Sequence, residues 1–173
     1  MTLESSKNLG GVGAILVVIG VLGFFGTAYA GVLSLIGIIL TLIALKGLAD
    51  HYNEGGIFNN ALYGFITAIV GGVAFFAVLV AMVLWTISGL DWTDPTAIQQ
   101  HFMDLNNVWS LLGGILIAFV VLFIFGIIVA ILARKSLTAL SMKSGVGIFG
   151  TAALLWLIGA VLTIIVIGLI LIW

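Results

Sequence analysis

Charged residues fall in a few short clusters along the chain and leave four long uncharged intervals between them. The intervals are residues 8–45, 55–90, 105–133 and 144–173, with lengths of 38, 36, 29 and 30 residues. An α-helix rises about 1.5 Å per residue, so about 20 apolar residues cross the roughly 30 Å hydrocarbon core of a membrane. This pattern predicts an all-α integral membrane protein in which each of the last two intervals forms one transmembrane helix.

The first two intervals are longer than one span requires. The small-residue stretch Gly26-Thr27-Ala28-Tyr29-Ala30-Gly31 predicts a turn that divides the first interval into two spans. The interval 55–90 is ambiguous, because Gly71-Gly72 could divide it into halves of marginal length, and we interpret it as one long, tilted helix. The prediction is a single transmembrane domain, residues 1–173, with five spans at about 9–27, 31–49, 58–87, 106–135 and 146–172.

The distribution of charge predicts how these spans cross the membrane. Five spans place the N-terminus, the loop near 46–56 and the loop near 134–146 on the same side. These segments hold every basic residue of the chain: Lys7, Lys46, Arg134, Lys135 and Lys143. The other side receives Asp91, Asp94 and Asp104 and no basic residue. Basic residues collect in cytoplasmic loops, so we predict a cell-membrane protein with its N-terminus in the cytoplasm and its C-terminus outside. The basic side chains are expected to meet anionic lipid headgroups, at about 1 kcal/mol each.

Aromatic residues follow the same boundary. We assign an outer interfacial belt to Tyr29, Trp85, Trp92, Trp109 and Trp173, because Trp and Tyr are enriched at membrane interfaces. Trp156 lies in the middle of a predicted span, and we expect it to pack between helices.

The outer loop also contains a helix signal. Asp94 followed by Pro95 is typical of an N-cap and a first helical position. Ile98, Phe102 and Leu105 then recur at helical spacing, which predicts a short amphipathic helix at about 94–104 on the outer membrane surface.

The second and third predicted spans resemble the fourth and fifth. Gly37-Ile38-Ile39 matches Gly126-Ile127-Ile128, and Lys46 matches Lys135 at the same offset of 89 residues. After two extra residues, Gly56-Ile57-Phe58 matches Gly147-Ile148-Phe149. One hypothesis is a lone first helix followed by two similar helical hairpins of the same orientation. A chance alignment of apolar segments is the alternative.

Composition excludes several classes of function. The chain is 64% hydrophobic and 6% charged, with a mean hydropathy of +1.44, whereas soluble domains are about 25% charged. It has no Cys, so thiolate metal sites and Cys nucleophiles are excluded. A net charge of −1 offers no electrostatic surface for nucleic acid. Its 23 glycines allow close approach of helix backbones in a membrane.

We assign no catalytic, cofactor-binding or metal-binding residue. The outer carboxylates with His101, and the group Asp50, His51 and Glu54, could in principle bind a metal, but a solvated loop is the favoured interpretation of both. The only charged residues within the predicted spans are Lys46, Arg134 and Lys135, at the inner ends, and the interior of each span is uncharged, which argues against an ion-coupled pump. The polar groups within the spans are uncharged groups such as the hydroxyls of Thr41, Thr67, Ser110, Thr151 and Thr163.

Two segments carry a resemblance to a known family. They are Ser6-Lys7-Asn8-Leu9-Gly10-Gly11-Val12-Gly13, and Gly31 to Leu40 continued by Ile43-Ala44-Leu45-Lys46-Gly47-Leu48-Ala49. Together with Gly159 to Thr163 in the last span, they resemble an uncharacterised archaeal family of multi-pass membrane proteins, the domain of unknown function 996. The resemblance implies an archaeal cell membrane, and it implies no activity and no catalytic residue.

These observations favour a non-catalytic structural or accessory subunit of a membrane protein assembly. Its expected partners are membrane lipids and either a second copy of the chain or other membrane subunits, with no cofactor. The alternative is a small channel or transporter built on the two hairpins, with the span hydroxyls lining a polar cavity. A lipid-modifying enzyme would require converging carboxylates or histidines at one interface, and the outer acidic loop is the sole candidate for that.

Overall fold

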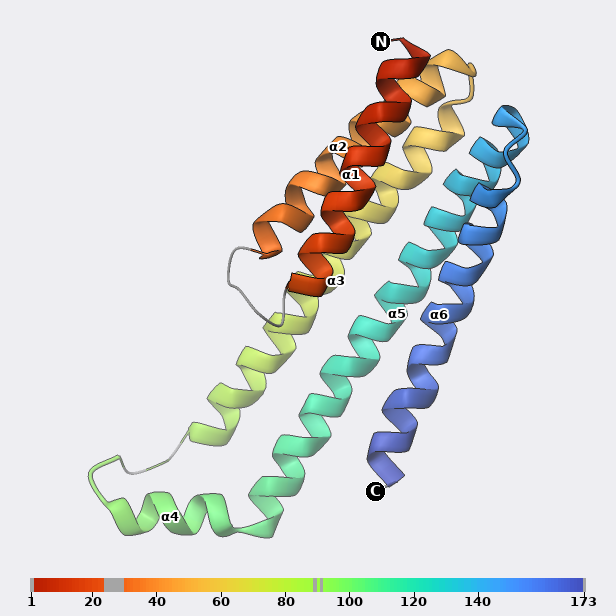
Figure 1. Cartoon of the computed structure of the whole chain (residues 1–173). Coiled ribbons are helices and arrows are strands. Elements are labelled where there is room, and N and C mark those ends of the chain that lie inside the picture. The colour runs from red at the N-terminus through yellow and green to blue at the C-terminus, as the bar shows by residue number, and fades with distance from the viewer. Residues whose placement is uncertain (1, 24–29, 89, 91, 173) are drawn as a thin grey trace. The chain divides into compact units, whose positions relative to one another are not determined.

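The computed structural model describes residues 2–23, 30–88, 90 and 92–172, with side chains for all of these except residues 30, 102 and 164–172. Tyr29, Asp91 and Trp173 therefore lie outside the described residues, as does the predicted turn at 26–31 for the most part. Within this part of the chain the fold is all-helical (Figure 1). The helices are α1 (Leu3–Gly23), α2 (Ala30–His51), α3 (Gly55–Ile87), α4 (Pro95–Met103), α5 (Leu105–Ser144) and α6 (Ile148–Ile172).

Four of these helices, α1, α2, α3 and α5, are long and apolar enough to cross a membrane by length and composition. In α6, the part with described side chains, Ile148–Thr163, is apolar but shorter than a full span. The interval 55–90 contains one helix rather than two, because α3 continues without a break through Gly71-Gly72.

Helix α5 is longer than the sequence predicted. The prediction ended this helix near residue 135 and placed a loop at 134–146, whereas α5 continues to Ser144. Arg134, Lys135 and Lys143 therefore lie on helix, and the turn is confined to Gly145-Val146-Gly147. Gly145 has a φ of +72°, a left-handed conformation that glycine adopts without strain. The prediction was wrong because charge was taken as a loop signal, although Arg, Lys, Leu and Ala are good helix formers in water.

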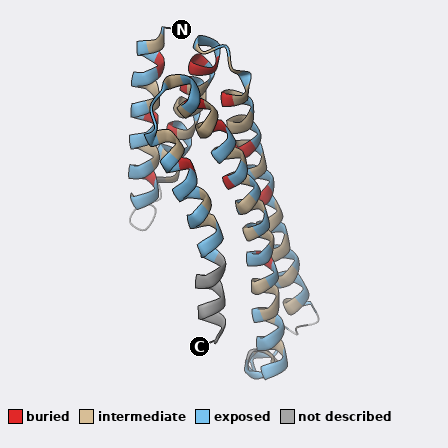
Figure 2. Cartoon of the chain, turned by 90° about the vertical axis from the view of Figure 1, so that its right-hand side faces the viewer, coloured by how far each residue is buried: buried red, intermediate tan, exposed pale blue. Residues whose placement is uncertain are grey.

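The chain divides into two compact units. Unit 1 contains residues 1–65 and 129–159, and unit 2 contains residues 66–128 and 160–173. Helices α3, α5 and α6 each contribute one part to either unit. Figure 2 shows few buried positions among many exposed ones, which fits helices whose apolar sides meet lipid.

In unit 1, α1 packs along α2 at a close approach of the two backbones. A Cβ atom built on Gly13 would lie 2.8 Å from the carbonyl oxygen of Gly37, and one built on Gly37 would lie 2.7 Å from the carbonyl oxygen of Gly13. Only glycine allows this separation, which is the role predicted for the glycine-rich first span.

Unit 1 also contains a buried apolar cluster made by Leu48, Ala49, Ile57 and Leu140. Partly buried side chains pack around it, including Leu3 of α1 and Phe149 of α6. The start of α1, the end of α2, the start of α3, the end of α5 and the start of α6 therefore meet at one end of this unit. We call this end the basic end, because the three segments that hold the basic residues converge there.

The proposed repeat does not extend to the packing of its matched residues. Ile57 is completely buried in the cluster, whereas its counterpart Ile148 is 71% exposed. Gly37 contacts α1, whereas no atom lies within 4 Å of a Cβ built on its counterpart Gly126. The similarity therefore holds for the order of residues and not for their surroundings.

Candidate lipid-facing site

The basic end of unit 1 carries all five basic residues of the chain and three acidic ones, Glu4, Asp50 and Glu54. Two of the cations are paired. Lys46 Nζ lies 2.7 Å from Asp50 Oδ1, one helical turn further along α2, and 5.6 Å from the ring centre of Phe58. Lys143 Nζ lies 3.4 Å from Glu54 Oε2 and thereby joins the α5–α6 turn to the α2–α3 turn. These pairs are exposed, so each contributes at most about 1 kcal/mol to stability.

The other cations keep their positive charge uncompensated. Lys7, Arg134 and Lys135 are exposed, and none of them forms an ion pair with a residue that the structure describes. An uncompensated cation at the end of an apolar helix is suited to a lipid phosphate.

Arg134 and Lys135 are held in place by the residue that follows them. The hydroxyl of Ser136 is buried and donates to the carbonyl oxygen of Ile57 at 2.5 Å. This bond fixes α5 against the first turn of α3 across 79 residues of sequence. Sequence reasoning missed Ser136, although its position four residues before the buried Leu140 places both on one face of α5.

The predicted outer helix is present in unit 2 as α4. The carboxylate of Asp94 accepts from the backbone N–H of Thr96 at 2.8 Å and from its hydroxyl at 2.6 Å, and Pro95 is the first helical residue. The hydrogen bond from the Thr96 hydroxyl is the largest cause that lowers the pKa of Asp94 below its ordinary value of 3.8. Asp94 is thus the N-cap that the Asp-Pro sequence predicted.

Two further contacts tie α4 to its neighbours in unit 2. His101 Nε2 lies 2.8 Å from the carbonyl oxygen of Thr86 near the end of α3. The side-chain amide of Asn107 in α5 donates to the carbonyl oxygen of His101 at 3.0 Å. The histidine therefore has a structural role in joining α3, α4 and α5.

The described members of the aromatic belt, Trp85, Trp92 and Trp109, are exposed and all belong to unit 2. Trp156 is also 55% exposed, so the expectation that it packs between helices of this chain was wrong.

The carboxylates and histidines that were considered as metal ligands form no ligand set in the described part of the chain. Among the residues that the structure describes, no three His, Asp or Glu side chains are placed to hold a metal ion. His51 instead forms an edge-to-face contact with the ring of Tyr52, with 5.0 Å between the ring centres.

Two of the span hydroxyls bond to the preceding turn of backbone. Thr41 donates to the carbonyl oxygen of Gly37 at 2.8 Å within α2, and Thr151 donates at 3.5 Å to that of Gly147, the residue before α6. Ser110 and Thr163 are exposed, and Thr67 is half-buried. A hydroxyl that donates to a carbonyl oxygen of the preceding turn has its hydrogen bond within its own segment, so it does not require a polar cavity.

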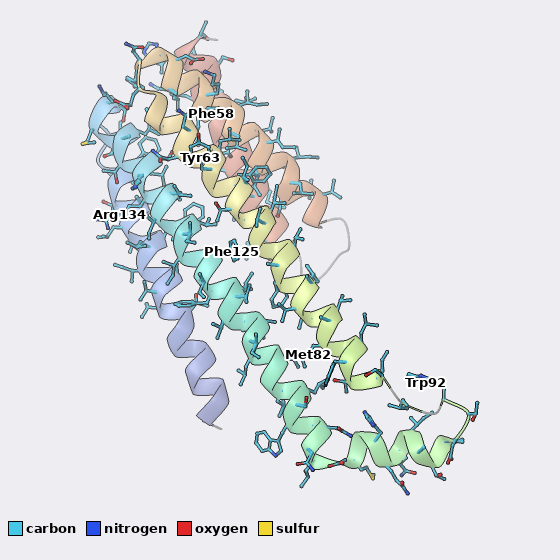
Figure 3. All side chains as sticks on the ribbon, turned by 180° about the vertical axis from the view of Figure 1, so that it is seen from behind. Phe58, Tyr63, Met82, Trp92, Phe125 and Arg134 are labelled. Carbon is cyan, nitrogen blue, oxygen red and sulfur yellow. The ribbon has the colours of Figure 1, made fainter. Side chains whose placement is uncertain are left out.

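Glycines of unit 2 separate into two kinds. A Cβ on Gly71 would lie 2.5 Å from Cβ of Phe125, and one on Gly114 would overlap Met82, so both glycines let α3 and α5 approach (Figure 3). Phe75 and Phe119 extend this contact, with 5.8 Å between their ring centres. In the part of the chain that the structure describes, a Cβ built on the neighbouring Gly72 or Gly113 would meet no atom of a neighbouring element within 4 Å.

Comparison with known proteins finds relatives without an assigned function. A family described as "Protein of unknown function (DUF996)" matches residues 33–173. An uncharacterised protein of Methanocaldococcus jannaschii is 28% identical over 172 residues, which cover 99% of this chain and 86% of that protein. No solved structure matches the chain.

Proposed function

This chain belongs to the DUF996 family of proteins of unknown function, and we propose that it is a non-catalytic structural or accessory subunit of a membrane protein assembly. In this proposal it lies in the cell membrane as a multi-pass protein with five spans, of which α6 is the fifth. The N-terminus is cytoplasmic and the C-terminus is outside. The convergence of the three basic segments at one end of unit 1 supports this orientation, because a positive-inside protein needs them on one side.

The observation that carries the proposal is a set of glycines on α3 and α5 that close no contact between described helices. Gly71 and Gly114 bring the two helices together, whereas a Cβ added to Gly72, Gly113 or Gly126 would have no described atom of a neighbouring element within 4 Å. Glycine within a helix costs about 0.5–1 kcal/mol relative to alanine. A glycine that closes no contact within its own chain therefore fits a backbone that receives another helix.

Trp156 gives separate support. Trp is favoured at the membrane interface, and this one lies on the ninth residue of α6, well inside an apolar helix. The exposed apolar body of Trp156 supports a contact with a neighbouring subunit, where large aromatic residues contribute most of the binding energy.

The proposal is tested by the size of the native assembly. We expect the protein, extracted in a mild detergent, to migrate well above its 18.2 kDa mass after correction for bound detergent. Gly72→Leu and Gly126→Leu should shift it towards the monomer while the secondary structure and unfolding temperature stay as in the wild type. Gly71→Ala is the control, because it should lower the unfolding temperature by disturbing the contact with Phe125 within the chain, and it should not change the assembly size. A wild-type protein that is a monodisperse monomer under these conditions would contradict the proposal.

The alternative, a small channel or transporter on two parallel hairpins, has less support. It requires hydroxyls that converge on a polar path, whereas the hydroxyl of Thr41 bonds to Gly37 of its own helix and that of Thr151 bonds to Gly147, just before its helix. Flux of a small solute or ion through vesicles containing the purified chain alone would favour this alternative over a subunit role.

A further inference from the structure

A groove of about 490 Å³ opens between α3, α5 and α6 within unit 1. Its polar lining comprises Asn60 of α3 together with Arg134, Lys135 and Thr138 of α5. Its apolar lining includes Ile131 of α5 and Leu157 of α6. The groove opens onto the surface of unit 1. It contains Arg134 and Lys135, the two cations of α5 that form no ion pair with a described residue.

The spacing along α5 explains why these side chains share one groove. Arg134 and Thr138 are four residues apart, as are Ile131 and Lys135, so each pair lies on one side of the helix. Ser136, which directly follows the two cations, is buried and is bonded to Ile57 of α3. The cations therefore lie on a helix that is held to α3 beside them.

The polar groups of the groove are free to bind a ligand. Arg134 and Lys135 are exposed and form no ion pair with any described residue, whereas Lys46 and Lys143 are each paired with an acid. The side-chain amide of Asn60 donates to the carbonyl oxygen of Gly56 at 2.7 Å, so it is positioned by its own helix and carries no charge. No carboxylate lines the groove, so its net charge is positive.

The groove sets apolar groups beside its two cations. Ala139 and Met142 line it nearer to the basic end, and Ile131 lies further from that end than Arg134, by about 5 Å along α5 given a rise of 1.5 Å per residue. Leu157 of α6 adds a further apolar side chain beside Ile131 and the cations. An apolar tail along these side chains would place a headgroup beside Arg134 and Lys135. Arg binds phosphate through paired N–H groups, and Lys adds a compact charge.

We propose that this groove binds the phosphate headgroup of an anionic phospholipid, with Arg134 and Lys135 as the cationic contacts. The hydroxyl of Thr138 donates a further hydrogen bond, and the lipid tail lies along Ile131 and Leu157. The site rests on the proposed membrane location of the chain and does not depend on its assembly with other subunits. Basic pockets between helices at the cytoplasmic membrane surface commonly hold anionic headgroups in this way.

The test compares lipid retention by full-length variants in a neutral detergent, measured by native mass spectrometry with phosphatidylglycerol or phosphatidylcholine added. The wild type should retain phosphatidylglycerol at least tenfold better than phosphatidylcholine. The double variant Arg134→Gln/Lys135→Gln should lose this preference. The matched control is Lys46→Gln/Lys143→Gln, which removes the same charge from the same end of unit 1 outside the groove and should change retention less than threefold.

Several results would overturn the site. An equal loss of phosphatidylglycerol retention in both double variants would indicate general electrostatic attraction. Displacement of phosphatidylglycerol by an equal, millimolar concentration of inorganic phosphate would indicate a site for free phosphate. If Arg134→Gln/Lys135→Gln fails to fold, Thr138→Val and Arg134→Lys replace it, and unchanged retention in both would contradict the proposal. The native assembly size should be the same in the wild type and the groove variants, so a failure of this site is distinguishable from a failure of the subunit proposal.

Discussion

Two glycines in the middle of α1, Gly11 and Gly13, differ in what surrounds them although they are only two positions apart. A Cβ on Gly13 would lie 2.8 Å from both the backbone nitrogen of Thr41 and the carbonyl oxygen of Gly37, while one on Gly11 would meet nothing within 4 Å. We expect Gly13→Ala to lower the free energy of unfolding by about 1–3 kcal/mol, because α2 backbone must move away. Thermal unfolding in detergent measures this. Gly11→Ala should be neutral or stabilising, and equal effects of both variants would show that α1 does not pack on α2 in this register.

A second prediction concerns Ser136. Its buried hydroxyl donates to the carbonyl oxygen of Ile57, so Ser136→Ala should destabilise the protein by about 0.5–1.5 kcal/mol. The effect should be modest because the carbonyl oxygen is also within a helix and is not left without a donor. Chemical unfolding in mixed micelles gives the difference. Ser110→Ala, at an exposed position, is the control, and a loss of equal size there would argue against the α3–α5 bond.

Residue-level contacts were only partly predictable from the sequence. The abundance of glycine indicated close helix packing, but not which glycine of the pairs Gly71-Gly72 and Gly113-Gly114 would be used. Adjacent helix positions differ by about 100° in direction, so that choice depends on where the partner helix lies. Trp156 illustrates the same limit, because an apolar residue in an apolar helix carries no signal that separates a lipid-facing from a packed position.

At the scale of the element, α4 is the helix whose start was best defined. Because the pKa of Asp94 is lowered in the folded protein, its stabilisation of α4 is complete above the ordinary value of 3.8 and is lost as the pH falls through the lower folded value. We expect the first turn of α4 to fray in acid, with faster amide exchange or a shifted amide resonance at Thr96. Asp94→Asn should cap the helix without this pH dependence, and Asp94→Ala should fray it at neutral pH as well. An Asn variant with the same acid transition would assign the change to another group.

The positions of most helices could be predicted from the uncharged intervals, but the residues at which the helices end could not. The sequence predicted the start of α4 from Asp94-Pro95, because a cap is a local interaction. The continuation of α5 to Ser144 was not predicted, because the charged residues from Arg134 onward were taken to end the helix, although a helix can continue through polar residues beyond its apolar part. The buried cluster around Ile57 was equally hidden, since its members come from segments far apart in sequence.

At the scale of the whole molecule, the proposed orientation can be tested directly because the chain has no Cys. A single introduced Cys is then the sole thiol that a membrane-impermeant maleimide can label. Gln99→Cys in α4 should be labelled in intact cells, whereas Ser144→Cys at the end of α5 should be labelled only after the cells are opened. A C-terminal epitope should be reached from outside if α6 is the fifth span. Labelling of both cysteines from the same side would contradict the positive-inside argument.

The buried cluster at the basic end has a consequence for how the protein is made. Ser136 and Ile57 are separated by 79 residues, and at ~5–20 residues per second the ribosome needs roughly 4–16 s to supply the second partner after the first. The contact between α1 and α2 can form during this delay, and Ile57 can pack on Leu48 and Ala49, but its contact with Leu140 must wait until that residue emerges. A nascent chain arrested before residue 136 would therefore carry a first pair of helices that can pack and a third helix that still lacks its contacts with α5.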